Sequence, residues 1–279
     1  MEFGFVTGWN ETNFKLAAEI GFDGVEIGVG GPLDPTTATN DDAKRVREQL
    51  EEIGTKALTL FYAGDFAVAD PAAQEQVWKS FKRVMEMAPI MGTDTVTTLA
   101  WTPAGASRDE MIKFYAKSFG QFAKWAEDCG VKVGIENWPG GGRNIAFSPA
   151  NWTRMWEEVP SMAVGLEFDP SHLVWQGVDY IAALREHSSR VHAFHAKDTE
   201  IFTKVLEVQG NLLPGWWRYR IPGWGIIDWR EIFMALNDFG YDGRIIVEHE
   251  DPIFSGDRWA EGLRFGLEEL LGHIDPAKR

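Results

Sequence analysis

The chain has 279 residues, 44% of them hydrophobic, and carries 27 basic against 42 acidic side chains, a net charge of −15 at pH 7. That apolar content can bury a large core, which excludes a disordered chain. The single cysteine, Cys129, excludes a disulfide framework and a thiolate-cluster metal site. A surface this acidic repels phosphate backbones, and no apolar run approaches the ~18 residues of a membrane span. We therefore expect a cytoplasmic protein with neither a nucleic-acid nor a membrane partner.

Short apolar segments alternate with longer segments of helical periodicity along the whole chain. The expected strands are Phe3–Thr7, Gly24–Ile27, Lys56–Leu60, Thr95–Thr98, Val131–Asn137, Val164–Asp169, Val191–Lys197 and Arg244–His249. Short β-branched runs of this kind are typical of parallel strands covered on both faces. Repeated β-then-α units predict a single (β/α)8 TIM barrel domain over residues 1–279. An open doubly wound sheet is the alternative, although no Gly-x-Gly-x-x-Gly motif follows the first strand.

The segments between the expected strands carry helix start and stop signals. Ser107 and Glu110 form a capping-box pattern, and Gly130 marks the end of the helix that this box begins. Pro71 suits the first turn of another helix, which Pro89 is expected to kink or end. These signals support helices between the strands.

Four polar residues stand at the ends of four successive expected strands: Glu136, Asp169, His195 and Glu248. In a barrel these ends converge on one rim, where active sites are built. Three carboxylates close together repel one another unless a cation or a proton neutralises them. Oxygen ligands with one imidazole suit Mn²⁺ or Mg²⁺, with Co²⁺ and Zn²⁺ as alternatives. The alternative interpretation is that the carboxylates are ordinary loop residues and that His195 is a core histidine.

Two further features concern the same rim. Trp101 and Trp138 lie near strand ends, where they would either stack on the C–H face of a sugar or pack under loops. Thr199–Ile227 is a long segment without a regular pattern, and such loops are usually lids or binding segments. It could close over a substrate or dock on a neighbouring subunit.

The chain resembles the xylose-isomerase-like barrel superfamily, the sugar phosphate isomerase/epimerase group. The marks of the resemblance are Glu136-Asn137, Glu167-Phe168-Asp169-Pro170-Ser171-His172, His195-Ala196-Lys197-Asp198, Pro222-Gly223-x-Gly225 and Glu248. The resemblance implies one divalent metal, Mn²⁺ favoured, held by Glu136, Asp169, His195 and Glu248. It also implies that His172 faces substrate or metal and that Arg220 holds substrate oxygens. We add Lys197 to the expected substrate contacts, because its charge would be costly to bury unpaired.

The chemistry that the resemblance implies is proton transfer beside a metal-bound carbonyl through an enediolate, with Glu136 and Glu248 as acid–base residues. This predicts an isomerase or epimerase of a keto-sugar or cyclitol. One alternative is a lyase that cleaves a 3-keto-glycoside, as in C-glycoside-cleaving enzymes, which work with a small β-rich partner. Another is a non-catalytic sugar-binding or scaffold subunit. We expect the chain to form a homo-oligomer, or a hetero-oligomer with the small β-rich subunit if it is such a lyase. The related DNA-repair endonucleases use histidines on earlier strands, and none of the six histidines precedes His172.

Overall fold

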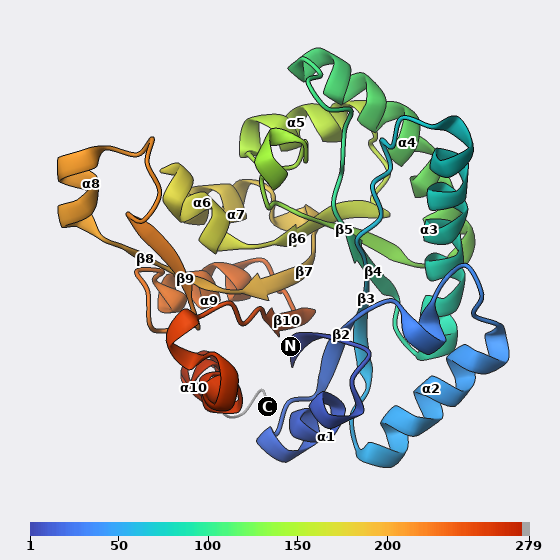
Figure 1. Cartoon of the computed structure of the whole chain (residues 1–279), viewed down its shortest axis with the longest axis horizontal. Helices are drawn as coiled ribbons and strands as arrows, with labels where there is room; N and C mark the ends of the chain where they lie inside the picture. The colour runs from blue at the N-terminus through green and yellow to red at the C-terminus, as the bar shows by residue number, and fades with distance from the viewer. Residues whose placement is uncertain (275–279) are drawn as a thin grey trace.

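The computed structural model of the chain describes residues 1–274, and within them eight parallel strands close into a barrel in the order β1-β10-β7-β6-β5-β4-β3-β2 (Figure 1). The strands are β1 (Glu2–Gly8), β2 (Gly24–Gly28), β3 (Ala57–Tyr62), β4 (Thr95–Thr98), β5 (Lys132–Glu136), β6 (Val164–Phe168), β7 (Val191–Ala196) and β10 (Arg244–Val247). Each overlaps the strand expected at that place. The TIM barrel prediction is therefore confirmed.

Helices pack around the outside of the barrel (Figure 1). They are α1 (Glu11–Ile20), α2 (Asn40–Ile53), α3 (Pro71–Met91), α4 (Arg108–Cys129), α5 (Pro149–Glu158), α6 (Pro170–Gln176), α7 (Tyr180–Glu186), α9 (Trp229–Asp238) and α10 (Trp259–Leu271). The capping box of Ser107 and Glu110 is present at the start of α4, and Gly130, at φ +67°, ends the helix. Left-handed φ is easy for glycine, so the predicted boundaries of α4 are confirmed.

Pro89 neither ends nor interrupts α3. The helix continues to Met91, and the N–H of Gly92 bonds to the carbonyls of Ala88 and Pro89. A proline removes one helical hydrogen bond, but near the end of a helix few further bonds depend on it. Gly92, and not Pro89, therefore marks the end of this helix.

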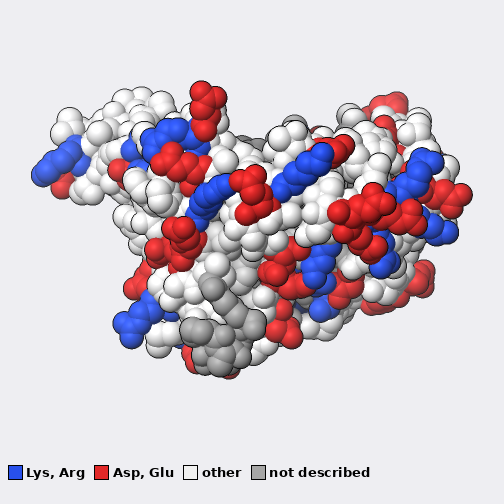
Figure 2. Space-filling view, turned by 90° about the horizontal axis from the view of Figure 1, so that it is seen from below, with Lys and Arg blue, Asp and Glu red and all other residues white. Residues whose placement is uncertain are grey.

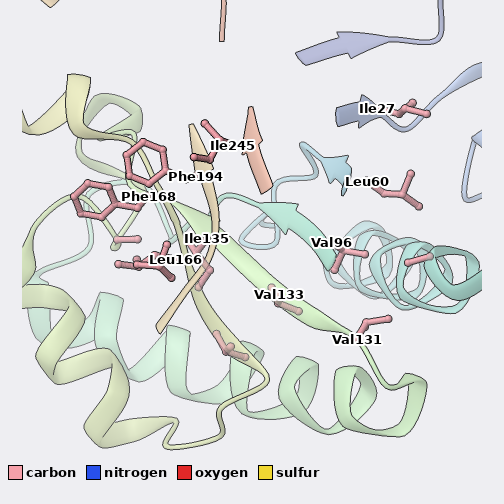
Figure 3. Packing of buried hydrophobic residues seen from close by; sticks show 14 of the residues in the cluster. Ile27, Leu60, Val96, Val131, Val133, Ile135, Leu166, Phe168, Phe194 and Ile245 are labelled. Atoms are coloured by element: carbon pink, nitrogen blue, oxygen red, sulfur yellow. The ribbon is translucent and has the colours of Figure 1, made fainter. Parts of the chain in front are cut away.

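Alternation along the strands separates the core from the interior of the barrel. Val133 and Ile135 on β5 and Leu166 and Phe168 on β6 are fully buried in the apolar cluster (Figure 3). Because successive side chains of a strand point to opposite faces, the residues that alternate with them face the inside of the barrel. Glu136, which follows Ile135 on β5, is one of these residues. The packing that covers the strands thus directs a carboxylate inward.

Residues 198–220 form an arm that extends from the barrel beyond β7 (Figure 1). It consists of β8 (Asp198–Ile201), α8 (Thr203–Gln209) and β9 (Trp217–Arg220), with β8 and β9 paired antiparallel. The expectation of an irregular segment over Thr199–Ile227 is therefore wrong for about half of its length, where β8, α8 and β9 lie. Glu200 pairs with Arg218 and Thr199 with Tyr219, and such cross-strand pairs stabilise a hairpin.

The surface mixes both signs of charge. On the face shown in Figure 2, Asp and Glu side chains are interspersed with Lys and Arg. Many pair along one helix, as Lys15 does with Glu11 and Lys79 with Glu75. Such exposed pairs each contribute at most about 1 kcal/mol, so the apolar core carries the stability. No helix within residues 1–274 combines the length and the apolar character needed to cross a membrane.

Candidate metal centre

The four residues expected to form one site lie on adjacent strands. Glu136 ends β5, Asp169 follows β6, His195 lies in β7 and Glu248 follows β10. These strands are neighbours in the barrel, in the order β10-β7-β6-β5. All four positions are at the carboxyl ends of parallel strands, the face on which TIM barrels build active sites.

Their polar atoms converge. Nδ1 of His195 lies 3.1 Å from Oε2 of Glu248 and 3.6 Å from Oε1 of Glu136. Glu136, Asp169, His172 and Glu248 each present one ligand atom, and these four atoms lie within 4.8 Å of one another. The structure thus brings together the three predicted carboxylates, with His172 as the fourth member of the group and His195 in contact with two of the carboxylates.

Two of the atoms that face this space have no hydrogen-bond partner among the described residues, namely Oδ2 of Asp169 and Nδ1 of His195. Both side chains are almost fully buried. Because an unpaired buried polar atom is costly, such atoms call for a ligand that the protein itself does not supply. A divalent ion fits this donor set of carboxylate oxygens and one imidazole nitrogen.

Asn137 fixes the backbone of one of these ligands. Its amide nitrogen donates to the carbonyl of Asp169 at 2.8 Å, and its Oδ1 accepts from the N–H of Asp169 at 2.7 Å. Oδ1 of Asp169 in turn accepts from the N–H of Ser171 at the start of α6, which leaves Oδ2 turned toward the site. At the end of β5, Glu136 thus points into the site, while the next residue, Asn137, orients Asp169 at the end of β6.

A second polar layer lies under the first, and the sequence analysis missed it. Nε2 of His195 lies 3.2 Å from Oε1 of Glu26 and 3.1 Å from Oε1 of Glu167. Glu26 also accepts hydrogen bonds from the hydroxyls of Thr59 and Thr97. These residues come from β2, β3, β4, β6 and β7, so they meet across the interior of the barrel. An acidic residue at an inward position of an otherwise apolar strand was the signal for this layer.

Charge sharing sets the protonation of both layers. Burial alone would raise the pKa of Glu136, but its hydrogen bond with His172 and the nearby His195 ring hold that pKa well below the ordinary value. Burial would likewise raise the pKa of Glu248, but the nearby Lys197 ammonium lowers it. Burial and the charge of Glu26 raise the pKa of Glu167 well above its usual range. The surroundings of Glu167 thus favour its protonated form, whereas those of Glu136 and Glu248 favour the ionised form.

Lys197 lies among the carboxylates of the site. Its Nζ is 2.6 Å from Oε2 of Glu248, 2.9 Å from Oε2 of Glu250 and 3.4 Å from Oδ2 of Asp169. The side chain is 1% exposed, and the surrounding carboxylates raise its pKa although burial would lower it. Lys197, which the sequence analysis expected to contact substrate, thus lies in direct contact with two of the four expected metal ligands, Asp169 and Glu248.

Arg220, to which the resemblance assigns substrate oxygens, forms two ion pairs in the structure. Its Nε donates to Oδ2 of Asp251 at 2.7 Å and its Nη1 to Oε2 of Glu200 at 2.6 Å. The guanidinium is nearly buried in these two ion pairs, which join the end of the arm to the segment after β10. Arg220 therefore holds the arm against the segment that follows β10.

Trp101 and Trp138 form a pair at the rim. Their rings pack edge to face at a centroid distance of 5.7 Å, and Trp138 is 37% exposed. The guanidinium of Arg143 lies over the Trp101 ring, which fixes it further. Trp138 is the member of the pair with surface left to contact a ligand.

The closed barrel with carboxylates and histidines at its rim defines a TIM barrel with a candidate metal centre. Residues 14–269 match the family described as Xylose isomerase-like TIM barrel, and the chain belongs to this family. The expected resemblance is thereby confirmed. The uncharacterized protein YfiH of Bacillus subtilis (strain 168) is 28% identical over 93% of each chain.

Other relatives match over part of their length. The inosose dehydratase of Geobacillus thermodenitrificans is 36% identical over 43% of this chain and 42% of its own, and that of Clostridium beijerinckii is 32% identical over 59% and 56%. Among solved structures, the 3-keto-D-glucoside 4-epimerase YcjR of E. coli superposes with a TM-score of 0.75 at 19% identity, covering 98% of this chain and 99% of that one. A zinc-bound IolI protein superposes at 0.77 with 21% identity, covering 98% of each. At these identities the structural likeness shows the fold.

Proposed function

We propose that the chain is a divalent-metal-dependent isomerase or epimerase that removes and returns a proton beside the carbonyl of a keto-sugar or cyclitol. The observation that carries the proposal is the convergence of Glu136, Asp169 and Glu248 with His172, beside which Nδ1 of His195 lies 3.1 Å from Glu248. Oδ2 of Asp169 and Nδ1 of His195 are buried there without a hydrogen-bond partner among the described residues. Relatives named for reactions on sugars and inososes support the substrate class. Mn²⁺ is favoured by the oxygen-rich donor set, with Mg²⁺, Co²⁺ and Zn²⁺ as alternatives.

Glu136 and Glu248 are the proposed proton carriers. They come from β5 and β10, with β6 and β7 between them, so they would flank a bound substrate from two sides. The lowered pKa values of both carboxyls keep them ionised at neutral pH, as a base requires. A bound dication would supply the positive charge that stabilises the anion left behind when the proton departs. One carboxylate acting alone gives isomerisation, and two acting in turn give epimerisation.

Solvent exchange tests this proposal directly. The protein is incubated in D₂O with D-fructose, an inosose and a 3-keto-glucoside, and deuterium at the carbon beside the carbonyl is followed by NMR. We expect exchange that EDTA abolishes, that Mn²⁺ restores and that Glu136→Gln lowers. Glu19→Gln, at an exposed residue paired with Arg264, is the matched control. Exchange that is indifferent both to chelation and to Glu136→Gln would contradict the proposal.

A dehydratase or lyase is the second candidate, through the same proton abstraction. Lys197 favours it, because an ammonium group beside Glu248 could stabilise a departing oxygen on that side of the substrate. Two partial relatives named inosose dehydratase point the same way. The product distinguishes a dehydratase or lyase from an isomerase or epimerase. Elimination yields an unsaturated ketone that absorbs in the ultraviolet, whereas isomerisation yields no such product. Co-purification of a small β-rich chain would favour the 3-keto-glycoside lyase.

A further inference from the structure

The arm supplies a hydroxyl group to the metal centre. Tyr219 lies on β9, and its Oη is 2.8 Å from Nδ1 of His172. The same Oη accepts a hydrogen bond from Nε1 of Trp175 on α6 at 3.3 Å. His172 is 1% exposed, so within residues 1–274 this hydroxyl is the group that the Nδ1 side of its ring meets. Sequence reasoning had placed His172 in the site but had not connected it to the arm.

The direction of these hydrogen bonds follows from the donors. An indole nitrogen can only donate, so the Tyr219 oxygen accepts from Trp175. The remaining partner of the hydroxyl within the described chain is Nδ1 of His172, and the hydroxyl proton is therefore donated there. A neutral imidazole carries a single N–H, so a ring that accepts at Nδ1 is protonated at Nε2.

The opposite edge of the ring gives the same answer independently. Nε2 of His172 lies 3.1 Å from Oε1 of Glu136 and 3.2 Å from Oδ2 of Asp169. An ionised carboxylate only accepts hydrogen bonds, so the nitrogen that bonds to Oε1 of Glu136 donates. Both edges of the ring thus require one tautomer.

We propose that Tyr219, held by Trp175, is a positioning residue that keeps His172 as the Nε2–H tautomer, so that His172 donates a hydrogen bond into the site and is not a metal ligand. The nitrogen ligand is then His195, whose Nδ1 has no hydrogen-bond partner among the described residues. The inference rests on the proposed function only for the identity of the ion and the substrate. A carbonyl or hydroxyl oxygen that enters beside Glu136 would receive this N–H.

The surroundings of Tyr219 hold its ring in place. The ammonium of Lys197 lies over the ring at 4.3 Å, and the Trp217 ring packs on it at a centroid distance of 4.8 Å. Trp217 also stacks on Trp175 at 4.9 Å and an interplanar angle of 5°. Burial raises the pKa of Tyr219 above its ordinary value, so the hydroxyl retains the proton that it donates. The docked position of the arm is therefore linked to the proton position on His172.

Long-range ¹H–¹⁵N NMR of the metal-free, histidine-labelled full chain tests the tautomer. We expect His172, assigned with His172→Gln, to show a protonated Nε2 and an unprotonated Nδ1. Tyr219→Phe should increase the Nδ1–H form, while Tyr180→Phe, which removes a hydroxyl bonded to Asp228, should not. A wild-type His172 protonated at Nδ1, or spectra that Tyr219→Phe leaves unchanged, would overturn the proposal.

Calorimetric titration with Mn²⁺ distinguishes a positioning role of Tyr219 from a structural role and from a role in metal binding. Tyr219→Phe keeps the ring on Lys197, so we expect its Mn²⁺ affinity to stay within about threefold of wild type. With a substrate found by deuterium exchange, kcat/KM should fall by about tenfold or more, as for one oriented hydrogen bond. A loss of Mn²⁺ affinity as large as that of His195→Gln would overturn the assignment. If wild type binds no Mn²⁺, the proposed function fails, while the NMR result still decides the tautomer.

Discussion

The Nδ1 atom of His195 faces Oε2 of Glu248 at 3.1 Å, while Nε2 of the same ring lies 3.2 Å from Oε1 of Glu26. One imidazole therefore joins the rim to the interior of the barrel. Carboxylates that hold the far nitrogen of a ligating histidine orient the ring and strengthen its binding of a metal. Rotation of the ring would break the contacts in both layers, so the interior residues fix the direction in which Nδ1 points.

This geometry predicts different metal affinities for two histidine variants. His195→Gln should weaken Mn²⁺ binding by about 100-fold or more, because it removes the proposed nitrogen ligand and the contact with the second layer. His172→Gln should weaken it by less than about tenfold, because that ring donates a hydrogen bond in the proposed arrangement. Titration calorimetry measures both, with circular dichroism to confirm that each variant is folded. The reverse order of affinities would make His172 the ligand.

Metal binding should also depend on pH, with a sign that follows from His195. Burial would lower the pKa of this ring, but the neighbouring carboxyl groups of Glu167 and Glu26 raise it well above the ordinary value. The metal-free ring therefore holds a proton at neutral pH, and that proton must leave before Nδ1 can bind a metal. Mn²⁺ affinity should rise with pH, by at most about tenfold per unit, up to the raised pKa. Calorimetry in two buffers of different ionisation enthalpy would count the released proton. Equal affinities at acidic and alkaline pH would contradict the assignment.

Glu136→Gln and Glu248→Gln should each lower turnover by about 10²–10⁴-fold, the usual contribution of a positioned acid–base group. Neither change should unfold the protein, because each removes one of several mutually repelling carboxylates from the metal-free site. Steady-state kinetics on the substrate identified by exchange, together with thermal unfolding, provides the check. Glu157→Gln on the exposed surface of α5 is the control. Full turnover in both site variants would remove these residues from the mechanism.

The two glutamates of the interior layer should differ in their effect on stability. Glu26 accepts from Thr59, Thr97 and His195, so Glu26→Gln leaves buried donors without their acceptor and should cost about 2–5 kcal/mol of unfolding free energy. Burial and the charge of Glu26 raise the pKa of Glu167 and favour its neutral form, so Glu167→Gln should cost less than about 1 kcal/mol. Urea unfolding of the metal-free variants at pH 7 compares them. Equal losses would show that Glu167 is ionised.

The barrel and its rim could be predicted because both depend on local patterns. Strand residues such as those at 95–98 are set by β-branched runs between glycines and helices, and once the strands are parallel their ends must meet on one face. The interior layer could not be predicted, since the contact between Glu26 and His195 exists only after the barrel closes. The bond from Tyr219 to His172 likewise depends on how the arm folds back. A single sequence carries no local signal for either contact.

Arg220 offers the clearest separation between a residue that binds substrate and one that holds the fold. Asp251 is fully buried against its guanidinium, so Arg220→Ala should lower the unfolding free energy by about 3–5 kcal/mol through an uncompensated charge. Arg218→Ala should cost less than about 1 kcal/mol, because Arg218 and its partner Glu200 are partly exposed. Thermal and urea unfolding measure both losses. If Arg220 instead held substrate oxygens, as the resemblance implied, the alanine variant would keep its melting temperature and show a raised KM.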